Sequence, residues 1–336
     1  MTARLHVERA NHLLTVQDRG RQGAMRFGVS QSGAMDWVRF SHALALAGGD
    51  PHAAFEIGIA GAVFRAEGSL AFALTGPGFL ARIEGAEPQT LTPPVRAVLH
   101  DGERLVIQPG STGMWAYLAV PGLDFGAPVL GSYATNARTG LGARDFSEPF
   151  DVADAASLPA RLEALDIPLT GGPIGLLPGP QHHLFSEAAR ATFTSGPYRL
   201  TEQVDRMGYR LAGEPLRAET HDIISDGIVE GAIQVPGNGQ PIVLCADRAP
   251  TGGYPKIAVV AAADRPRLTQ SRPGTDLTFR WLTLDEAHKR RQAIRAAVKA
   301  PPQPRLKSEF TSEYLFNRNL IGGVIAATLD HTFDEP

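Results

Sequence analysis

The 336-residue sequence contains a single cysteine, Cys245, and only four lysines among its 32 basic residues. One cysteine excludes an internal disulfide and any zinc site that needs several thiolate ligands. No apolar run approaches the roughly 18 residues that a membrane-spanning helix requires. The first residues lack the basic-then-apolar pattern of a signal peptide, and the net charge of −3 favours neither nucleic acid nor an anionic membrane as a partner. We therefore expect a cytoplasmic protein.

Several catalytic motifs are also missing. The sequence has no Walker-type phosphate-binding loop, no G-x-S-x-G nucleophile elbow and no H-E-x-x-H metal motif. No methionine lies directly before any of the four lysines, so the Met-Lys-Met signature of biotin attachment is absent. We therefore expect no covalent biotin on this chain. His182 and His183 are adjacent and would point apart on a strand, so we expect no metal site.

Glycine and proline are in surplus, with 36 and 26 residues. Because both are costly inside a helix, the surplus excludes coiled coils, helical bundles and helical solenoids. Short segments rich in β-branched and aromatic residues lie between these breakers. The pattern predicts a mainly β protein, a sandwich or a closed barrel, with few helices. The clearest predicted strands are 70–74, 104–107, 114–120, 242–245, 257–262 and 276–281.

Three helices are predicted. Residues 36–47 carry apolar side chains at helical spacing and are followed by two glycines, which are typical of a helix end. Residues 155–165 form a second, shorter candidate. Residues 284–300 form the third, because Thr283 and Glu286 match a capping box that satisfies free amides at a helix start.

Weak internal sequence similarity suggests that the chain has two similar halves. Residues 16–20 read VQDRG and residues 204–208 read VDRMG, while Glu56 and Glu230 occupy comparable places downstream. Duplication explains these matches, and chance matching of common residues is the alternative. We expect a boundary in the turn-rich segment LTGGPIGLLPG. The predicted organisation is an N-terminal domain over 1–167, a C-terminal domain over 168–300, and a linker and tail over 301–336.

Lys256 stands out because no other lysine occurs before residue 289. An ammonium is a compact charge that can donate to an oxyanion or a phosphate. Its pKa can also shift, whereas a guanidinium cannot lose its proton. The preceding Thr251, Gly252 and Gly253 allow the backbone to approach a ligand closely. These features predict a functional site, and the alternative is an exposed lysine that protects a strand edge from pairing.

Other polar residues in the second half lie among predicted turns, where binding and catalytic residues are common. Asp205, Arg206 and Arg210 are suited to a reaction or, equally, to a structural ion-pair network. Glu230 and Gln234 flank one turn and could orient a substrate amide or close a strand end by hydrogen bonds.

The first half has a polar group of its own, made of Asp18, Ser32, Asp36 and Glu56. Ser32 or Asp36 can cap the helix predicted over 36–47. The functional alternative is an anion bound at that helix N-terminus, with Glu56 holding the loop.

Seven segments, taken together and in order, resemble one family. They are VQDRGRQG, FGVSQSGAMD, GPQ followed by F, DRMGYRLAG, SDGIVEGAIQVPGNGQPIVL, DRAPTGGYPKIAVVAAAD and NRNLIGGVIAA. The family is that of the 5-oxoprolinase C-subunit, also called allophanate hydrolase subunit 2 or the biotin-dependent carboxyltransferase family. The resemblance covers residues 12–328 and implies two tandem cyclophilin-like β-barrel domains. His182 and His183 depart from the family pattern, where an acidic residue is usual nearby.

The resemblance also implies a function. It points to one subunit of an ATP-dependent 5-oxoprolinase, which hydrolyses 5-oxoproline (pyroglutamate) to glutamate together with two partners. These are a kinase-inhibitor-like subunit and a lactam-utilisation-type subunit, the B and A components of the enzyme. ATP would be held by loops other than a Walker loop and shared with these partners. The alternatives are a carboxyltransferase that acts on urea or a related amide with biotin on another chain, and a non-catalytic regulator that binds a kinase-inhibitor-like partner.

Side-chain type and clustering suggest the site residues. We assign catalytic roles to Asp205, Arg206, Glu230 and Lys256. We assign substrate binding to Arg210, Gln234, Thr251, Gly252, Gly253, Tyr254, Asp18, Ser32, Asp36 and Glu56.

Overall fold

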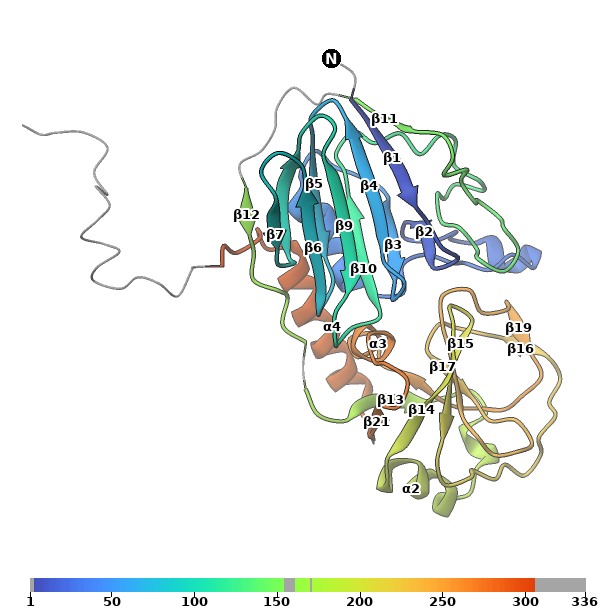
Figure 1. The fold of residues 1–336 in the computed structure, drawn as a ribbon. Helices are drawn as coiled ribbons and strands as arrows, with labels where there is room; N and C mark the ends of the chain where they lie inside the picture. The colour runs from blue at the N-terminus through green and yellow to red at the C-terminus, as the bar shows by residue number, and fades with distance from the viewer. Residues whose placement is uncertain (1–2, 154–160, 170, 306–336) are drawn as a thin grey trace, which may run out of the picture. The chain divides into compact units, whose positions relative to one another are not determined.

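The first half of the chain forms two six-stranded antiparallel sheets, which a computed structural model shows in Figure 1. The structure describes residues 3–153, 161–169 and 171–305. In spatial order, one sheet contains β11 (Phe150–Val152), β1 (Ala3–Arg9), β4 (Ala62–Glu67), β9 (Arg104–Pro109), β6 (Phe79–Glu84) and β7 (Gln89–Leu91). The other contains β12 (Leu162–Glu163), β8 (Val95–Leu99), β5 (Leu70–Thr75), β10 (Trp115–Ala119), β3 (Ala54–Gly58) and β2 (Leu14–Gln17).

Apolar side chains from the two sheets share one core. Phe64 of the first sheet and Phe55 of the second lie with ring centroids 5.1 Å apart. Phe72 and Leu118 of the second sheet belong to the same buried cluster. Buried residues alternate with mostly exposed ones along β6 and with partly buried ones along β8, which is the pattern of strands with one face on a core.

The second half forms an eight-stranded sheet that nearly closes into a barrel. In spatial order it contains β21 (Asp276–Leu277), β14 (Tyr198–Val204), β15 (Gly208–Ala212), β18 (Ile242–Leu244), β17 (Ala232–Gln234), β20 (Lys256–Val260), β13 (Ile174–Pro178) and β22 (Phe279–Trp281). The two edge strands, β21 and β22, are separated only by Thr278. The edges are therefore joined through the chain itself, and the predicted mainly β, barrel-like fold is confirmed.

A small two-stranded sheet accompanies this barrel. Its strands are β16 (Asp226–Gly227) and β19 (Thr251–Gly252), and they pair Asp226 with Gly252.

Two of the predicted helices are confirmed together with their caps. The helix α1 (Trp37–Ala47) follows Asp36, whose carboxylate accepts two amides of the first turn. The helix α4 (Leu284–Lys299) begins with the capping box, in which Thr283 Oγ1 accepts the Glu286 amide at 3.2 Å. The helices that were not predicted are α2 (Glu187–Ser195), α3 (Arg265–Thr269) and the 3-10 helices η1 (Ala24–Phe27) and η2 (His182–Leu184).

The helix predicted over 155–165 is wrong in its described part. Leu162 and Glu163 form β12 and pair with Arg96 and Val95 of β8. A helical pattern this short is easily overridden when a sheet edge offers backbone partners. Residues 154–160 lie outside the described residues, as does the predicted tail segment beyond Arg305.

The two halves meet in a continuous apolar core that includes Phe40 and Trp115 of the first half and Tyr209 and Ile257 of the second. Trp115 Nε1 donates to the Tyr209 hydroxyl at 3.1 Å. The predicted boundary at residue 168 falls between β12 and β13, and no sheet in the described part of the chain contains strands from both halves. The division into separate domains stays a prediction.

No helix in the described part of the chain is long and apolar enough to cross a bilayer.

Candidate active site

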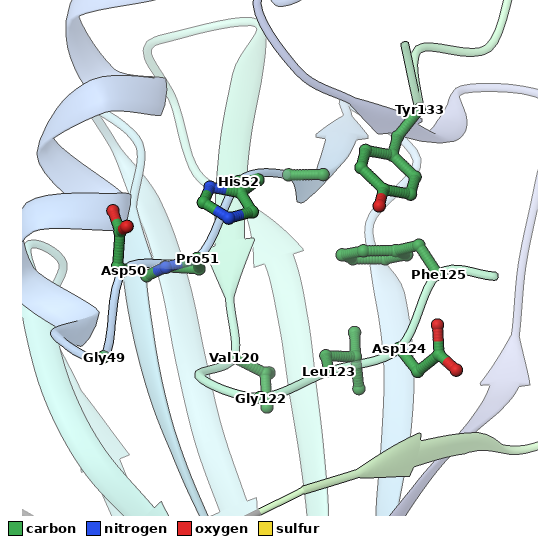
Figure 2. A pocket seen from close by; sticks show the side chains of 11 residues that line it. Gly49, Asp50, Pro51, His52, Val120, Gly122, Leu123, Asp124, Phe125 and Tyr133 are labelled. Atoms are coloured by element: carbon green, nitrogen blue, oxygen red, sulfur yellow. The ribbon is translucent and has the colours of Figure 1, made fainter. Parts of the chain in front are cut away.

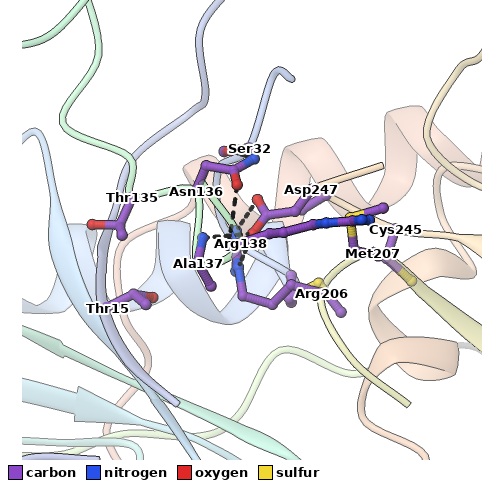
Figure 3. A network of polar contacts seen from close by, with 12 residues as sticks. Thr15, Ser32, Thr135, Asn136, Ala137, Arg138, Arg206, Met207, Cys245 and Asp247 are labelled. Atoms are coloured by element: carbon purple, nitrogen blue, oxygen red, sulfur yellow. Dashed lines mark hydrogen bonds and ion pairs between the residues drawn. The ribbon is translucent and has the colours of Figure 1, made fainter. Parts of the chain in front are cut away.

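Arg206 connects the two halves through a buried ion-pair network. It lies at the turn between β14 and β15 and donates to Gly33 O at 2.8 Å and to the Glu56 carboxylate. Its Nε and Nη2 atoms donate to the two oxygens of Asp247 at 3.0 and 3.1 Å. Figure 3 shows this pair beside Ala137, whose amide donates to Asp247 Oδ2 at 3.1 Å. The network joins segments that are distant in sequence.

The carboxylates on the first-half side of this network are held by several donors. Glu56 Oε2 accepts the Met35 amide and the Tyr117 hydroxyl, both at 2.8 Å. The Tyr117 oxygen in turn accepts the Asp36 amide at 2.7 Å. Gln270 Nε2 donates to Asp36 Oδ2 at 2.9 Å. Asp36 and Glu56 are fully buried, so these protein donors take the place of water around both carboxylates.

Burial dominates the electrostatics of this network. It raises the pKa of Glu56, and the attraction of Arg206 offsets this only in part. Burial also raises the pKa of Asp36, against the attraction of Arg39. For Arg206, burial acts to lower the pKa, but Glu56 and Asp247 outweigh it and the pKa lies above its ordinary value. One guanidinium therefore compensates two buried carboxylates and holds the halves together.

Asp18 and Asp205, the aspartates of the two similar motifs at residues 16–20 and 204–208, each stabilise a turn. Asp18 Oδ1 accepts the Gly20 amide and the Ser132 hydroxyl, each at 2.7 Å. Asp205 Oδ1 accepts the amides of Met207 and Gly208 at 2.8 and 3.0 Å, and its side chain is exposed. Each carboxylate closes an Asx-type turn of its own segment, and that of Asp18 also holds the loop at Ser132. The structure brings the Asp205 carboxylate to none of the other predicted catalytic side chains.

A cleft of about 1310 Å³ lies between the first half, Glu230 and Arg265 of the second half, and the end of α4. Asp18, Ser32 and Glu230 line it, so the cleft unites three of the predicted residues. Glu230 forms an ion pair with Arg265. The side chains that line the cleft are of both charge signs, and these three residues are the only predicted ones among them.

A smaller cavity of about 260 Å³ lies beside β10 and is shown in Figure 2. His52, Asp124, Phe125 and Tyr133 surround it. None of the predicted site residues lines this cavity.

Lys256 lies at a different place, on the barrel, and is only 1% exposed. It begins β20 directly opposite Gln234 of β17, which is 6% exposed, so the two side chains share one face of the sheet. Lys256 Nζ lies 3.7 Å from Asp226 Oδ2, an ion pair longer than a hydrogen bond. Among the described residues, neither Lys256 Nζ nor Gln234 Nε2 has a hydrogen-bond partner.

Three separate segments of the chain converge on Lys256. Gln181 Oε1 accepts the Lys256 amide at 3.2 Å, and Gln181 Nε2 donates to Asp226 Oδ2 at 3.2 Å. A Cβ on Gly179 would lie 2.3 Å from the Lys256 carbonyl oxygen, so the close strand contact requires glycine. The segments around residues 179–181, 226–227 and 251–256 thereby form one site, which we call the Lys256 site.

The small sheet contributes the remaining wall of the Lys256 site. A Cβ on Gly252 would lie 2.6 Å from Gln234 Nε2, so only glycine fits this closely against the amide. Gly253 O accepts the Ile223 amide at 2.9 Å. Thr251 is exposed, and Tyr254 is 43% exposed beside the site.

Sequence reasoning missed Gln181 and Asp226 as site residues, although the segments that contain them were noted. A hydrogen bond from Gln181, the Gly227 amide and the nearby Lys256 lower the pKa of Asp226, so this carboxyl is ionised near neutral pH. The sequence signal that could have identified these two residues is their position in turns. Gln181 follows Gly-Pro and Asp226 precedes Gly, and both patterns are typical of turns.

Several of the predicted residues gather at two buried places. Arg206, Glu56 and Asp36 lie in the buried junction, whereas Gln234, Gly252, Gly253 and Lys256 lie in the Lys256 site. Glu230 lies in the turn before β17, whereas Gln234 is the last residue of that strand. Arg210 is exposed on β15. Within the described ranges, no group of three or more potential metal ligands occurs.

The chain is thus a mainly β protein with two buried polar groups, the ion-pair network around Arg206 and the Lys256 site on the wall of the barrel. A family model described as the carboxyltransferase domain, subdomains A and B, matches residues 27–281. The chain belongs to this carboxyltransferase domain family, which confirms the resemblance seen in its sequence.

Individual relatives agree with this assignment. The 5-oxoprolinase C-subunit of Escherichia coli is 38% identical over 298 residues, which cover 86% of this chain and 94% of that protein. The urea amidolyase of Saccharomyces cerevisiae is 27% identical over 84% of this chain and 17% of its own length. The crystal structure of the protein TTHA0988 superposes with a TM-score of 0.74 at 31% identity. That alignment covers 83% of this chain and 56% of TTHA0988, so this chain spans just over half of that relative.

Proposed function

We propose that this chain is one subunit of an ATP-dependent 5-oxoprolinase, which hydrolyses 5-oxoproline to L-glutamate, and that the Lys256 site contacts the substrate. The assignment of the activity is supported by the E. coli relative, whose match covers nearly all of both chains. The observation that carries the site is the convergence of three segments on a buried ammonium without a hydrogen-bond acceptor among the described residues.

The chemistry of lactam opening fits the side chains found there. An unactivated lactam is a poor electrophile, and phosphorylation of its oxygen by ATP turns that oxygen into a better leaving group. Buried N–H donors such as those of Lys256 and Gln234 stabilise negative charge on the substrate far better than exposed ones. Asp226, which is ionised and 3.7 Å from the ammonium, is placed to accept a proton from attacking water. The lactam C–N bond then breaks, its nitrogen takes up a proton, and the carbon keeps the phosphorylated oxygen as an acyl phosphate. A second water displaces this oxygen as inorganic phosphate and leaves glutamate.

ATP and the partner proteins complete this proposal. The sequence has no Walker-type loop, so we assign ATP binding to loops shared with a kinase-inhibitor-like subunit and a lactam-utilisation-type subunit. The chain would then be active only within such a complex. This arrangement agrees with the names of the bacterial relatives, which are designated as subunits.

Reconstitution tests the proposal. The full chain, combined with the two partner proteins from the same organism, is incubated with 5-oxoproline and ATP, and glutamate release is measured. We expect glutamate only when all three proteins and ATP are present. Release that continues at the same rate without this chain would exclude it as a necessary component.

A carboxyltransferase activity is the second candidate, and the matched family model favours it. The Lys256 ammonium would then hold the carboxyl group that moves from carboxybiotin on another chain to an amide nitrogen. Transfer of labelled carboxylate from free carboxybiotin to urea, lost in Lys256→Met, would support this reading. Absence of transfer in the intact protein, alongside glutamate release in the complex, would reject it.

A further inference from the structure

The two unpartnered donors of the Lys256 site define what kind of ligand the site takes. Removing an ammonium from water costs several kcal/mol unless an anion compensates it, and a buried amide N–H without an acceptor costs about 1–3 kcal/mol. Among the described residues, Lys256 Nζ and Gln234 Nε2 carry both penalties side by side. A ligand that accepts from both would recover them.

Asp226 does not supply that acceptor. Its carboxylate is half exposed and remains 3.7 Å from the ammonium. It accepts from Gln181 Nε2 at 3.2 Å and from the Gly227 amide at 2.7 Å. Asp226 therefore compensates the charge of Lys256 at a distance and leaves the hydrogen-bonding capacity of the ammonium unused.

The Lys256 site is closely packed beside Gln234. Gly252 lies against the Gln234 amide, where a Cβ would approach Nε2 to 2.6 Å and Ile228 Cδ1 to 2.8 Å. Gly252 belongs to β19, and the short pairing of β19 with β16 covers this side of the Lys256 site. Two strands of two residues have little stability of their own, and a ligand would reach the two donors by displacing this short pairing.

We propose that the Lys256 site binds a carboxylate, with one oxygen on Lys256 Nζ and the other on Gln234 Nε2. Lys256 and Gln234 are register partners across β20 and β17, so their two side-chain donors can serve the two oxygens of one carboxylate. A neutral carbonyl would leave the ammonium with only the distant carboxylate of Asp226 as counter-charge, and a phosphate would bring acceptor oxygens for which the site has no further unpartnered side-chain donor atom among the described residues. Resting on the proposed function, the carboxylate is that of 5-oxoproline, which positions the lactam ring beside Asp226.

Binding to the isolated full chain tests this proposal without requiring turnover. Calorimetric titration compares 5-oxoproline with 2-pyrrolidinone, which has the same lactam ring and no carboxylate. We expect 5-oxoproline to bind at least tenfold more tightly than 2-pyrrolidinone. Lys256→Met and Gly252→Ala should each weaken 5-oxoproline at least tenfold, the second by crowding Gln234. Lys289→Met, which changes an exposed lysine of α4, should leave binding unchanged. Circular dichroism confirms that each variant is folded.

The outcomes separate this proposal from the proposed function. Equal binding of the two lactams, unchanged binding by Lys256→Met, or no binding of any carboxylate would overturn the carboxylate site, even if the reconstituted complex releases glutamate. If N-acetylglycine binds in a Lys256-dependent manner while 5-oxoproline does not, the carboxylate site stands and 5-oxoproline is the wrong substrate.

Discussion

Replacing Arg206 with methionine tests how the two halves are held together. Methionine has a similar length and no charge, so the change leaves Glu56 and Asp247 buried without their counter-charge. Removing one partner of a buried ion pair costs about 3–5 kcal/mol. Because single domains are stable by only about 5–15 kcal/mol, the loss should be large and easily measured. We expect the free energy of unfolding to fall by about 3–5 kcal/mol.

The pH dependence of this stability loss is a second, independent test of the role of Arg206. Burial raises the pKa of Glu56 in the folded protein above its unfolded value, so the folded state binds the proton more tightly. Protonation of Glu56 therefore favours folding as the pH falls, and this contribution is lost as the pH rises through the raised pKa. Without Arg206 the raised pKa of Glu56 rises further. The deficit of the variant should accordingly shrink as the pH is lowered from neutral.

Urea unfolding at several pH values, followed by tryptophan fluorescence, measures both effects. Arg210→Met is the matched control, because Arg210 is an exposed arginine four residues further along the same hairpin; its effect should stay within about 0.5 kcal/mol. Adding Glu56→Gln and Asp247→Asn to Arg206→Met should restore part of the lost stability. A loss below about 1 kcal/mol, or a deficit that does not change with pH, would refute the role assigned to Arg206.

Two further changes test single contacts. Gly179→Ala places a Cβ 2.3 Å from the Lys256 carbonyl oxygen, so it should destabilise the protein by about 1–3 kcal/mol and weaken 5-oxoproline binding. Gly171→Ala is the control, because a Cβ there meets open space, and it should change neither stability nor binding. Equal stabilities of the two variants in urea unfolding would contradict the predicted crowding at Gly179. Thr283→Ala removes the cap of α4 and should cost about 1 kcal/mol in thermal unfolding. Hydrogen bonds from Thr283 lower the pKa of Glu286, so the stability that Glu286 adds is present above its unfolded pKa and fades as the pH falls through the lowered one. The difference between wild type and variant should narrow in acid, and a constant difference would argue against the capping box.

Much of the fold could be predicted because its signals are local. The caps at Asp36 and at Thr283 lie next to the helices that they start, and the strand segments carry their own residue preferences. The strand β12 was mistaken for a helix because its partner β8 is distant in sequence and decides its structure. The helix α3 has only five residues, too few for a periodic pattern to be recognised.

The candidate site was predictable only in part, for a similar reason. The scarcity of lysine singled out Lys256, and the glycines before it indicated close backbone approach. Gln181 and Asp226 were missed because they reach Lys256 through contacts that only the barrel creates. Asp205 and Arg206 are neighbours in sequence, yet one holds its own exposed turn and the other is buried against the opposite half. Residue type alone could not distinguish these two environments.

The rate of glutamate release by the reconstituted complex tests the central claim most directly. The complex is assembled with wild-type chain, with Lys256→Met, or with the control Lys289→Met, and all three chains are first shown to be folded and incorporated. We predict a rate at least tenfold lower for Lys256→Met and an unchanged rate for Lys289→Met. Wild-type turnover by the Lys256→Met complex would contradict the assignment of the Lys256 site to the reaction.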